Sequence, residues 1–397
     1  MAEILVLGVG FAGLWAALGA ARRTDELGAT DVGITVVSSQ PFHDIRVRNY
    51  EADLTECRIS LSQLLPPAGV DHVTADVLAI DTAARTVITS AGARTYDRLV
   101  VALGSRVQKP ALANLDAVGF DVDTYDGALR LQRHLDDLAS ADPRPEASTV
   151  VVVGAGLTGI ETACELPARL AALFPGAERR VVLVDRNAHV GSDMGASARP
   201  VIEAALRVNG VEVRLGVGVD AVGGDGVVLT DGDVVPAATV VWCAGMRANP
   251  LAAGLGVPCD GLGRVVVDEY LRVIGPAGVF AAGDVAAAPI DGPHLSVMSC
   301  QHARPMGRFA GYNVVGDLLG APQLPLQIPW YVTVLDLGPD DAVYTEGWDR
   351  RVVAEGIAAK ATKQLINCSR IYPPLTGERA DLLTAAAPAV QSAPPNG

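Results

Sequence analysis

The chain has 397 residues, of which half are hydrophobic and 19% are charged. This length suits two or three domains, and the hydrophobic content excludes a disordered protein. The net charge of −14 argues against a nucleic-acid partner and against binding to anionic lipid surfaces.

The cysteines and histidines are spread too thinly for a disulfide scaffold or a metal site. Even the closest cysteine pair, Cys243 and Cys259, is too far apart for a CxxC centre or a zinc knuckle, and the histidines form no ligand pattern. The sequence therefore predicts no metal, and we expect a cytoplasmic protein. Glycines interrupt the uncharged stretch at residues 4–21 and no basic residue precedes it, which favours a strand, a turn and a buried helix over a signal peptide.

The predicted elements begin with a βαβ unit. A buried strand at residues 4–7 leads into an apolar helix at residues 13–22, and a β-branched strand follows at residues 33–37. Further strands are predicted at residues 73–80 and 86–89, which form an antiparallel excursion, and at residues 99–102.

The same pattern returns after a helix at residues 126–138 and a Pro-containing linker at residues 141–147. The strand at residues 149–153 is followed by a helix and a strand, so one module is used twice. These and the later elements are a helix at 157–173, strands at 180–184, 240–243 and 278–282, two strands at 330–336 and 342–345, and a helix at 357–367.

Two GxGxxG turns each follow a predicted strand and open a helix. The first glycine turns the chain, the second lets the backbone approach a pyrophosphate, and the third lets helix and strand pack closely. The helix N-terminus offers free N–H groups to the phosphates. The repeat predicts two dinucleotide sites, at Gly8, Gly10, Phe11, Ala12 and Gly13 and at Gly154, Gly156, Leu157, Thr158 and Gly159.

The two units differ at the position that contacts the ribose. Asp185 ends its strand in the second unit, whereas Ser38 stands at the matching position of the first. A carboxylate accepts hydrogen bonds from a ribose 2′-OH, but a 2′-phosphate about 4 Å away would be repelled by up to ~4 kcal/mol at an effective dielectric of 20. The positive charge of the neighbouring Arg186 reduces this repulsion. The second site therefore favours NADH over NADPH.

Five motifs in this order resemble the two-dinucleotide-binding-domain flavoproteins of the pyridine nucleotide-disulfide oxidoreductase superfamily. They are GVGFAG at residues 8–13, YD and LVVALG at 96–104, GAGLTGIE at 154–161, TVVWCAG at 239–245 and FAAGD at 280–284. The resemblance implies an α/β fold with two Rossmann-like domains, the FAD domain being interrupted by the NAD domain. The expected divisions are an FAD-binding domain at 1–115 and 246–318, an NAD(P)H-binding domain at 116–245, a C-terminal α+β region at 319–380 and a disordered tail at 381–397.

Within the superfamily the chain is most similar to the type II NADH dehydrogenases. Residues 158–161 and the WCAGMR segment at 242–247 match their motifs. The resemblance implies that Glu161 lies between nicotinamide and flavin and that Asp284 binds the ribityl chain of FAD; an exposed first-turn glutamate is the alternative for Glu161. Pro305 replaces the second glutamine of the family's quinone-site pattern. The tail also lacks the family's basic amphipathic helix, so no stable membrane anchor is expected.

Other site residues are expected around these motifs. Arg46 and His43 are candidates for flavin or acceptor contacts, with a solvated loop as the alternative, Gln301 is a candidate acceptor contact, and His302 is a candidate proton donor because its ordinary pKa lies near neutrality. Further cofactor contacts are expected at Val77, Ala102, Gly104, Ala244, Gly245 and Gly283.

We therefore expect an enzyme that passes hydride from NADH to FAD and on to a quinone or another small aromatic acceptor. The alternatives are an NAD(P)H-dependent reductase for a protein electron carrier and a non-catalytic flavin redox sensor. Disulfide reductases are excluded because residues 39–56 contain no cysteine. The oligomeric state stays open, a homo-oligomer included.

Overall fold

The first nucleotide-binding domain is built on a parallel β-sheet. The computed structural model describes the chain except residues 113, 116–118, 142–143, 224–225 and 396–397, so parts of the predicted linker, of the predicted domain boundary and of the tail lie outside the described residues. The sheet has the strand order β21-β9-β1-β2-β5 with neighbouring strands parallel. Its strands are β1 (Ala2–Leu7), β2 (Val32–Ser38), β5 (Asp71–Thr74), β9 (Arg98–Val101) and β21 (Val279–Ala281).

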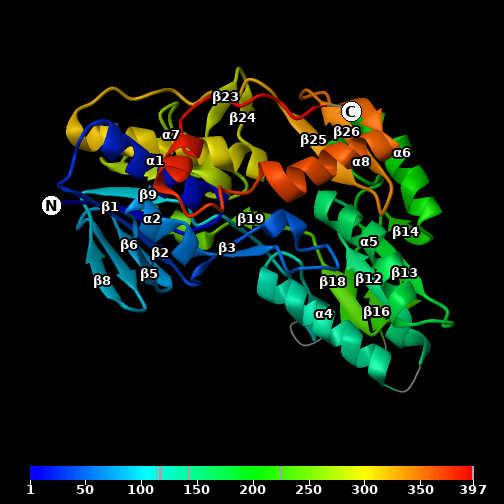
Figure 1. Cartoon of the computed structure of the whole chain (residues 1–397). Coiled ribbons are helices and arrows are strands. Elements are labelled where there is room, and N and C mark those ends of the chain that lie inside the picture. Colours follow the sequence, from blue (N-terminus) through cyan, green and yellow to red (C-terminus); the bar gives the residue numbers. More distant parts are fainter. Residues whose placement is uncertain (113, 116–118, 142–143, 224–225, 396–397) are drawn as a thin grey trace.

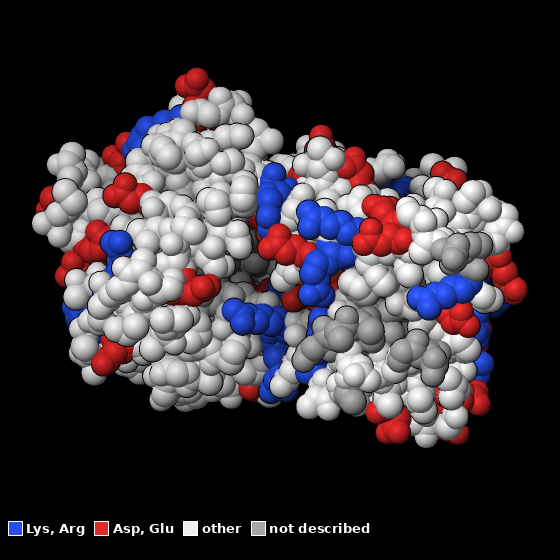
Figure 2. Space-filling model, turned by 90° about the horizontal axis from the view of Figure 1, so that it is seen from below, with Lys and Arg blue, Asp and Glu red and all other residues white. Residues whose placement is uncertain are grey.

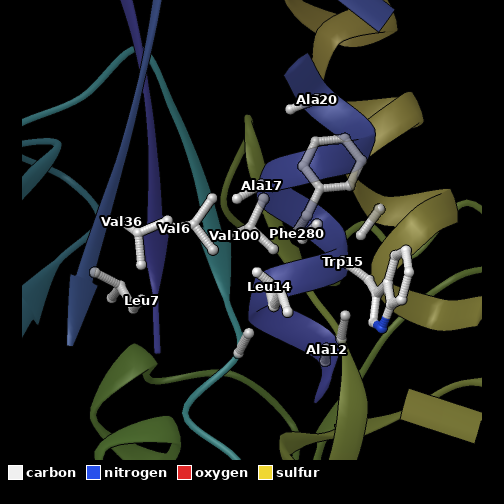
Figure 3. Packing of buried hydrophobic residues seen from close by; sticks show 14 of the residues in the cluster. Val6, Leu7, Ala12, Leu14, Trp15, Ala17, Ala20, Val36, Val100 and Phe280 are labelled. Atoms are coloured by element: carbon white, nitrogen blue, oxygen red, sulfur yellow. The ribbon is translucent and has the colours of Figure 1, made fainter. Parts of the chain in front are cut away.

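Helix α1 (Phe11–Glu26) lies between that sheet and helix α7 (Cys300–Leu319) (Figure 1). It is buried on both sides because its first ten residues are apolar or small. Figure 3 shows Leu14 and Ala17 facing the strands and Trp15 turned away from them. The two helices touch through small residues: a Cβ at Gly311 would come within 2.7 Å of the Ala20 nitrogen.

The second domain repeats the arrangement, with the strand order β11-β18-β12-β13-β14. Alternate residues of β12 lie in different cores, Val150 and Val152 on one face of the sheet and Val151 and Val153 on the other, as in a parallel sheet covered on both faces. The predicted α/β fold with two Rossmann-like parallel sheets is confirmed. The elements are β11 (Gly119–Phe120), α4 (Tyr125–Ser140), β12 (Thr149–Val153), α5 (Leu157–Leu173), β13 (Arg180–Asp185), α6 (Gly195–Val208), β14 (Val211–Leu215) and β18 (Thr239–Trp242).

Smaller sheets are attached to these domains. The sequence predicted one strand at residues 73–80, but the chain leaves the parallel sheet after Thr74, where the Ala75 N–H donates to the Ser38 carbonyl, and a separate antiparallel sheet follows. Strands β10 and β19 pair where the chain enters and leaves the second domain. The smaller elements are β3 (Phe42–Asp44), β4 (Arg58–Ser60), α2 (Leu65–Ala68), β6 (Val77–Asp81), β7 (Thr86–Thr89), β8 (Gly92–Thr95), β10 (Ser105–Val107), β15 (Val219–Gly223), β16 (Gly226–Leu229), β17 (Val234–Val235), β19 (Met246–Ala248), β20 (Val265–Val266), β22 (Ala286–Ala287), β23 (Pro289–Asp291) and β24 (His294–Leu295).

The C-terminal region packs against both domains. Leu335 and Val343 join the core of the second domain, whereas Ile371 joins that of the first. The sequence analysis predicted neither β27 here nor α6 in the second domain. The region consists of β25 (Val332–Asp336), β26 (Ala342–Glu346), β27 (Arg351–Glu355), α8 (Gly356–Leu365), a π-helical turn (Ile366–Arg370) and α9 (Arg379–Ala385).

The tail requires a correction, because disorder was expected at residues 381–397. Helix α9 instead buries Leu382 and Leu383 beside α1. The segment that follows crosses to the C-terminal sheet (Figure 1), where the carbonyl of Gln391 accepts a hydrogen bond from the Trp330 indole at 2.6 Å. Its composition gives no amphipathic pattern, but its backbone carbonyls supply the acceptors that order it up to residue 395.

Charged side chains mark the boundary between the two halves of the molecule. Figure 2 shows basic and acidic groups interspersed there. Ion pairs such as Arg58 with Asp126, at 3.3 Å, link the first domain to α4 of the second. Of the helices in the described residues, none combines the length and the apolar character that crossing a bilayer requires.

Candidate functional site

The first glycine turn joins β1 to α1 and leaves room for a ligand. Gly8 has a φ of +92°, and a Cβ there would lie 2.5 Å from the Ala102 carbonyl oxygen. At Gly10, in contrast, no described atom lies within 4 Å of the Cβ position, and no described side chain caps α1. The N–H groups of the first helical turn are therefore free to bind an anion. This geometry fits the pyrophosphate of a dinucleotide.

Arg46 and Asp284, both predicted for the FAD site, meet in space. The Ser105 hydroxyl donates to Asp284 Oδ2 at 2.6 Å, and Arg46 Nη1 lies 3.5 Å from the same oxygen. Arg46 also donates from Nε to Asp123 Oδ1 at 3.0 Å. Gly283 packs against Ala12, where a Cβ would lie 2.6 Å from the Ala12 Cβ, so this group lies beside the first turn.

His43 lies behind the first turn and does not line the large cavity described below. Its Nδ1 lies 2.8 Å from the carbonyl oxygen of Val9, and its ring packs edge-on against Phe11. Burial lowers the pKa of His43, which favours the neutral form of the ring. With Nδ1–H donating, Nε2 is an acceptor, and it is buried without a hydrogen-bond partner among the described residues.

The other residues predicted for the first cradle lie on its flanks. Ser38 already donates to the carbonyl of Gln40 at 2.7 Å and lies 2.9 Å from His72 Nε2. Val77 begins β6 and packs against the core of the first domain. Gly104 has a positive φ and open space at its Cβ position.

The second turn, between β12 and α5, has the same construction. Gly154 has a φ of +107° and its Cβ position lies 2.9 Å from that of Ala244, whereas no described atom lies within 4 Å of the Cβ position of Gly156. Asp185 stands at the end of β13, where its carboxylate accepts from the Ala155 N–H at 2.5 Å and from the Asn187 N–H at 2.7 Å. These bonds hold the carboxylate at the rim of the turn.

A cavity of about 1240 Å³ starts at this second turn and reaches the C-terminal region. Pockets for one small ligand measure roughly 300–1,000 Å³, so this cavity is larger than one such ligand needs. Its lining includes Gly156 and Asp185 at the second turn, the neighbouring side chains of Glu161 and Lys363, and Gln301 of α7. Gln301 donates from Nε2 to the carbonyl of Trp330 at 3.3 Å.

A buried ion pair lines this cavity. Lys363 Nζ lies 2.6 Å from Glu161 Oε1, and both side chains are about 10% exposed. Burial raises the pKa of Glu161 although Lys363 opposes this. Burial alone would lower the pKa of Lys363, but Glu161 and Asp336 raise it above its ordinary value. Burial and the ion pair thus act on Glu161 in opposite directions, and the neighbouring carboxylates hold the proton on Lys363.

Residues from three distant segments surround that pair. The Asp336 N–H donates to Glu161 Oε1 at 3.2 Å, and the Tyr50 hydroxyl donates to Asp336 Oδ2 at 3.0 Å. Lys360 bonds both carboxylate oxygens of Asp336, at 2.7 and 2.8 Å. From the sequence, Glu161 was the predicted site residue, and the helix that carries Lys360 and Lys363 was only a second choice for the acceptor side; Tyr50 and Asp336 were not predicted.

His302 lies elsewhere than the sequence suggested. It is a fully buried residue in the first turn of α7 and does not line the cavity, and its Nδ1 accepts a hydrogen bond of 3.0 Å from the Val297 N–H. Burial lowers its pKa to about 4, so it is neutral at physiological pH. Its ring packs edge-on against Tyr331 and Trp348. This environment favours a structural role over proton donation.

Known proteins resemble the chain over most of its length. Residues 2–307 match the family "Pyridine nucleotide-disulphide oxidoreductase". An NADH dehydrogenase-like protein of Mycobacterium tuberculosis is 66% identical over 400 residues, which cover 99% of this chain and 100% of that protein. A type II NADH:quinone oxidoreductase of Staphylococcus saprophyticus is 28% identical over 364 residues, 86% of this chain and 89% of that protein. NDH2 from Plasmodium falciparum, solved with NADH, has a TM-score of 0.77 over 97% of each chain at 13% identity, which shows the fold alone.

The chain therefore belongs to the pyridine nucleotide-disulphide oxidoreductase family. It is an NAD(P)H-dependent flavoprotein oxidoreductase of the NADH dehydrogenase-like kind. Its cofactors are FAD and NADH. The open Cβ positions at Gly10 and Gly156, together with two uncapped helix N-termini, fit these two dinucleotides.

Proposed function

We propose that the chain catalyses the oxidation of NADH by a quinone or another small aromatic acceptor. One hydride from NADH and one proton from solvent give the quinol and NAD⁺. FAD, when bound at the first turn, supplies the two-electron chemistry that links donor and acceptor. The observation that carries the proposal is the cavity that extends from Gly156 and Asp185, past Glu161, to Gln301 and the C-terminal region.

In this proposal Asp185 selects the donor. Its carboxylate is fixed at the rim of the second turn and accepts hydrogen bonds from the ribose hydroxyls of NADH. A 2′-phosphate at the same place meets a negative charge. Arg186 also lines the cavity and lessens the repulsion, so NADPH is disfavoured rather than excluded.

Glu161 and Lys363 supply the proton that quinol formation consumes. They are within hydrogen-bond distance of each other and both line the cavity. The raised pKa of Glu161 lets a carboxyl group hold a proton closer to neutral pH. Gln301 orients the acceptor with its side-chain amide, and the neighbouring Pro305 offers no such group and no backbone donor.

The assay separates the two half-reactions. Flavin reduction by NADH is followed anaerobically, and reoxidation is then followed with naphthoquinones, benzoquinones and a ferredoxin as acceptors. Rapid turnover with a quinone and none with the ferredoxin supports the proposal. Rapid reoxidation by the protein carrier alone contradicts it, and the absence of reoxidation by any acceptor would leave a flavin sensor as the better description. The relative from Staphylococcus saprophyticus, named for quinone reduction, supports testing quinones first.

A further inference from the structure

Two arginines on α7 are buried against an aromatic ring of α1. Arg304 is 9% exposed and Arg308 is 3% exposed. Their guanidinium carbons lie 5.4 Å and 4.1 Å from the centre of the Trp15 ring. Trp15 is the residue that Figure 3 shows turned away from the sheet, towards α7. The two side chains thus bring two positive charges into the space between α1, α7 and the tail.

No described carboxylate balances these charges. Burial lowers the pKa of Arg304 to about 10; the Cys300 thiol opposes this shift, and Arg370 adds to it by a smaller amount. Burial and Arg304 lower the pKa of Arg308 to about 9. The Nε atoms of both arginines are buried without a hydrogen-bond partner among the described residues. Buried charges are as a rule paired, so this pair lacks an anion.

Arg308 has one polar neighbour, which is neutral. With its side-chain oxygen turned towards the arginine, Gln391 accepts from the Arg308 guanidinium at 2.5 and 3.3 Å. This residue belongs to the tail segment that the Trp330 indole holds in place. One amide oxygen leaves most N–H donors of the two guanidinium groups without an acceptor, and it cannot supply a negative charge.

The unpaired charges face two cavities. A second cavity of about 500 Å³ is lined by Trp15, Arg304, Arg308, Tyr372 and Gln391, among others. Arg304 and Gln391 also line the large cavity that holds Glu161 and Gln301. The guanidinium of Arg304 therefore stands where the acceptor end of the large cavity borders the second one. Two neighbouring guanidinium groups can bind an acidic group, and the aromatic and apolar side chains beside them can pack against a flat ring. The site therefore suits a planar organic acid.

We propose that Arg304 and Arg308, with Trp15, form a binding subsite for an acidic group, and that the acceptor of this oxidoreductase is an aromatic compound that carries a carboxylate or sulfonate. The acidic group lies between the two guanidinium groups, and the aromatic body extends towards Gln301. The assignment of this acid to the acceptor rests on the proposed function; the anion subsite itself does not.

The subsite is tested by binding, without turnover. Isothermal titration calorimetry on the FAD-loaded protein compares naphthoate with naphthamide, which has the same shape and no charge. Naphthoate should bind at least about tenfold more tightly, since hydrogen bonds to charged groups are the stronger kind. Arg304→Gln and Arg308→Gln should each bring the two affinities close together, and Arg308→Lys should restore part of the preference.

Arg23→Gln is the matched control. Arg23 also places its guanidinium over an aromatic ring at the α1–α7 contact, that of Tyr312 at 4.1 Å, but it is paired with Glu26 and lines neither cavity. This variant should keep the wild-type preference for naphthoate. Equal affinities in the wild type, or an unchanged preference in both glutamine variants, would overturn the subsite.

The link to turnover is tested with two acceptors, naphthoquinone and its sulfonate. The sulfonate should lose at least about tenfold in kcat/KM relative to the neutral quinone when Arg304 or Arg308 is replaced. A wild type that reduces neither quinone refutes the proposed function while the calorimetry still decides the subsite. Unchanged relative rates in the variants, in a wild type that reduces both, refute the assignment of the acid to the acceptor.

Discussion

Replacing Lys363 by methionine isolates the contribution of the buried ion pair. The substitution keeps an unbranched side chain but removes the ammonium 2.6 Å from Glu161 Oε1. At an effective dielectric of 20 the attraction lost is about 6 kcal/mol before the desolvation of both charges is subtracted. Breaking such a pair costs roughly 3–5 kcal/mol of stability if the remaining charge stays buried. Glu161 avoids most of that cost by taking up a proton, because its pKa is already raised.

The expected kinetic result follows from that protonation. Without Lys363, Glu161 has no partner with which to exchange its proton. Reoxidation of the flavin by a quinone should therefore slow by about 100-fold, the lower range for acid–base catalysis. Reduction by NADH should be nearly unchanged. Glu161→Gln with Lys363→Met should be no slower than Lys363→Met alone, since the two residues act as one unit.

Anaerobic stopped-flow absorbance of the flavin measures both half-reactions. Lys109→Met is the control, because Lys109 forms an ion pair with Asp121 at 3.1 Å but does not line the cavity. A wild-type rate of reoxidation in Lys363→Met would refute the role of the pair in proton supply. An equal decrease in the rates of both half-reactions would refute it as well.

Three further predictions test the two glycine turns, the donor site and the buried histidine. Gly10→Val should fold without FAD, and Gly156→Val should keep FAD but lose NADH binding, because neither Cβ position has a described atom within 4 Å. Visible absorbance measures the bound FAD, and a titration with NADH measures donor binding. Stoichiometric FAD in Gly10→Val would refute the assignment of the first turn to FAD. Asp185→Ser should narrow the difference between NADH and NADPH in flavin reduction, and an unchanged ratio would show that Arg186 dominates. The pKa of His302 is lowered from 6.5 to about 4, so its neutral form stabilises the fold above pH 6.5 and that contribution, roughly 3 kcal/mol, is lost as the pH falls towards 4. Urea unfolding of His302→Gln should show a weaker loss of stability on acidification than the wild type, and identical slopes would contradict the burial argument.

Local patterns were sufficient to predict the two βαβ units and their glycine turns. The first glycines need a positive φ and the second need an open Cβ position, and both requirements are visible in a short stretch of sequence. Asp185 could be found because its distance from the turn is set by one helix and one strand. These features recur wherever a dinucleotide binds to this kind of turn.

The cluster around Glu161 and Lys363 could not be predicted in the same way. Tyr50, Asp336 and Lys363 come from three separate segments, and only the packed C-terminal region brings them to Glu161. The burial of His302, which lowers its pKa, was not predicted because burial depends on the whole fold. Two arginines on an apolar helix likewise suggest an exposed face until Trp15 and the tail are seen around them.

The interrupted first domain has a consequence for synthesis on the ribosome. The edge of β9 stays unpaired until β21 has been made, and the outer face of α1 stays uncovered until α7 follows. The elements from β11 to β18 are contiguous, so the second domain can fold while the first still waits for its last strand and helix. Unpaired strand edges and uncovered apolar helices are what chaperones bind. We therefore expect a chain truncated before β21 and α7 to bind no flavin, because its first domain is incomplete.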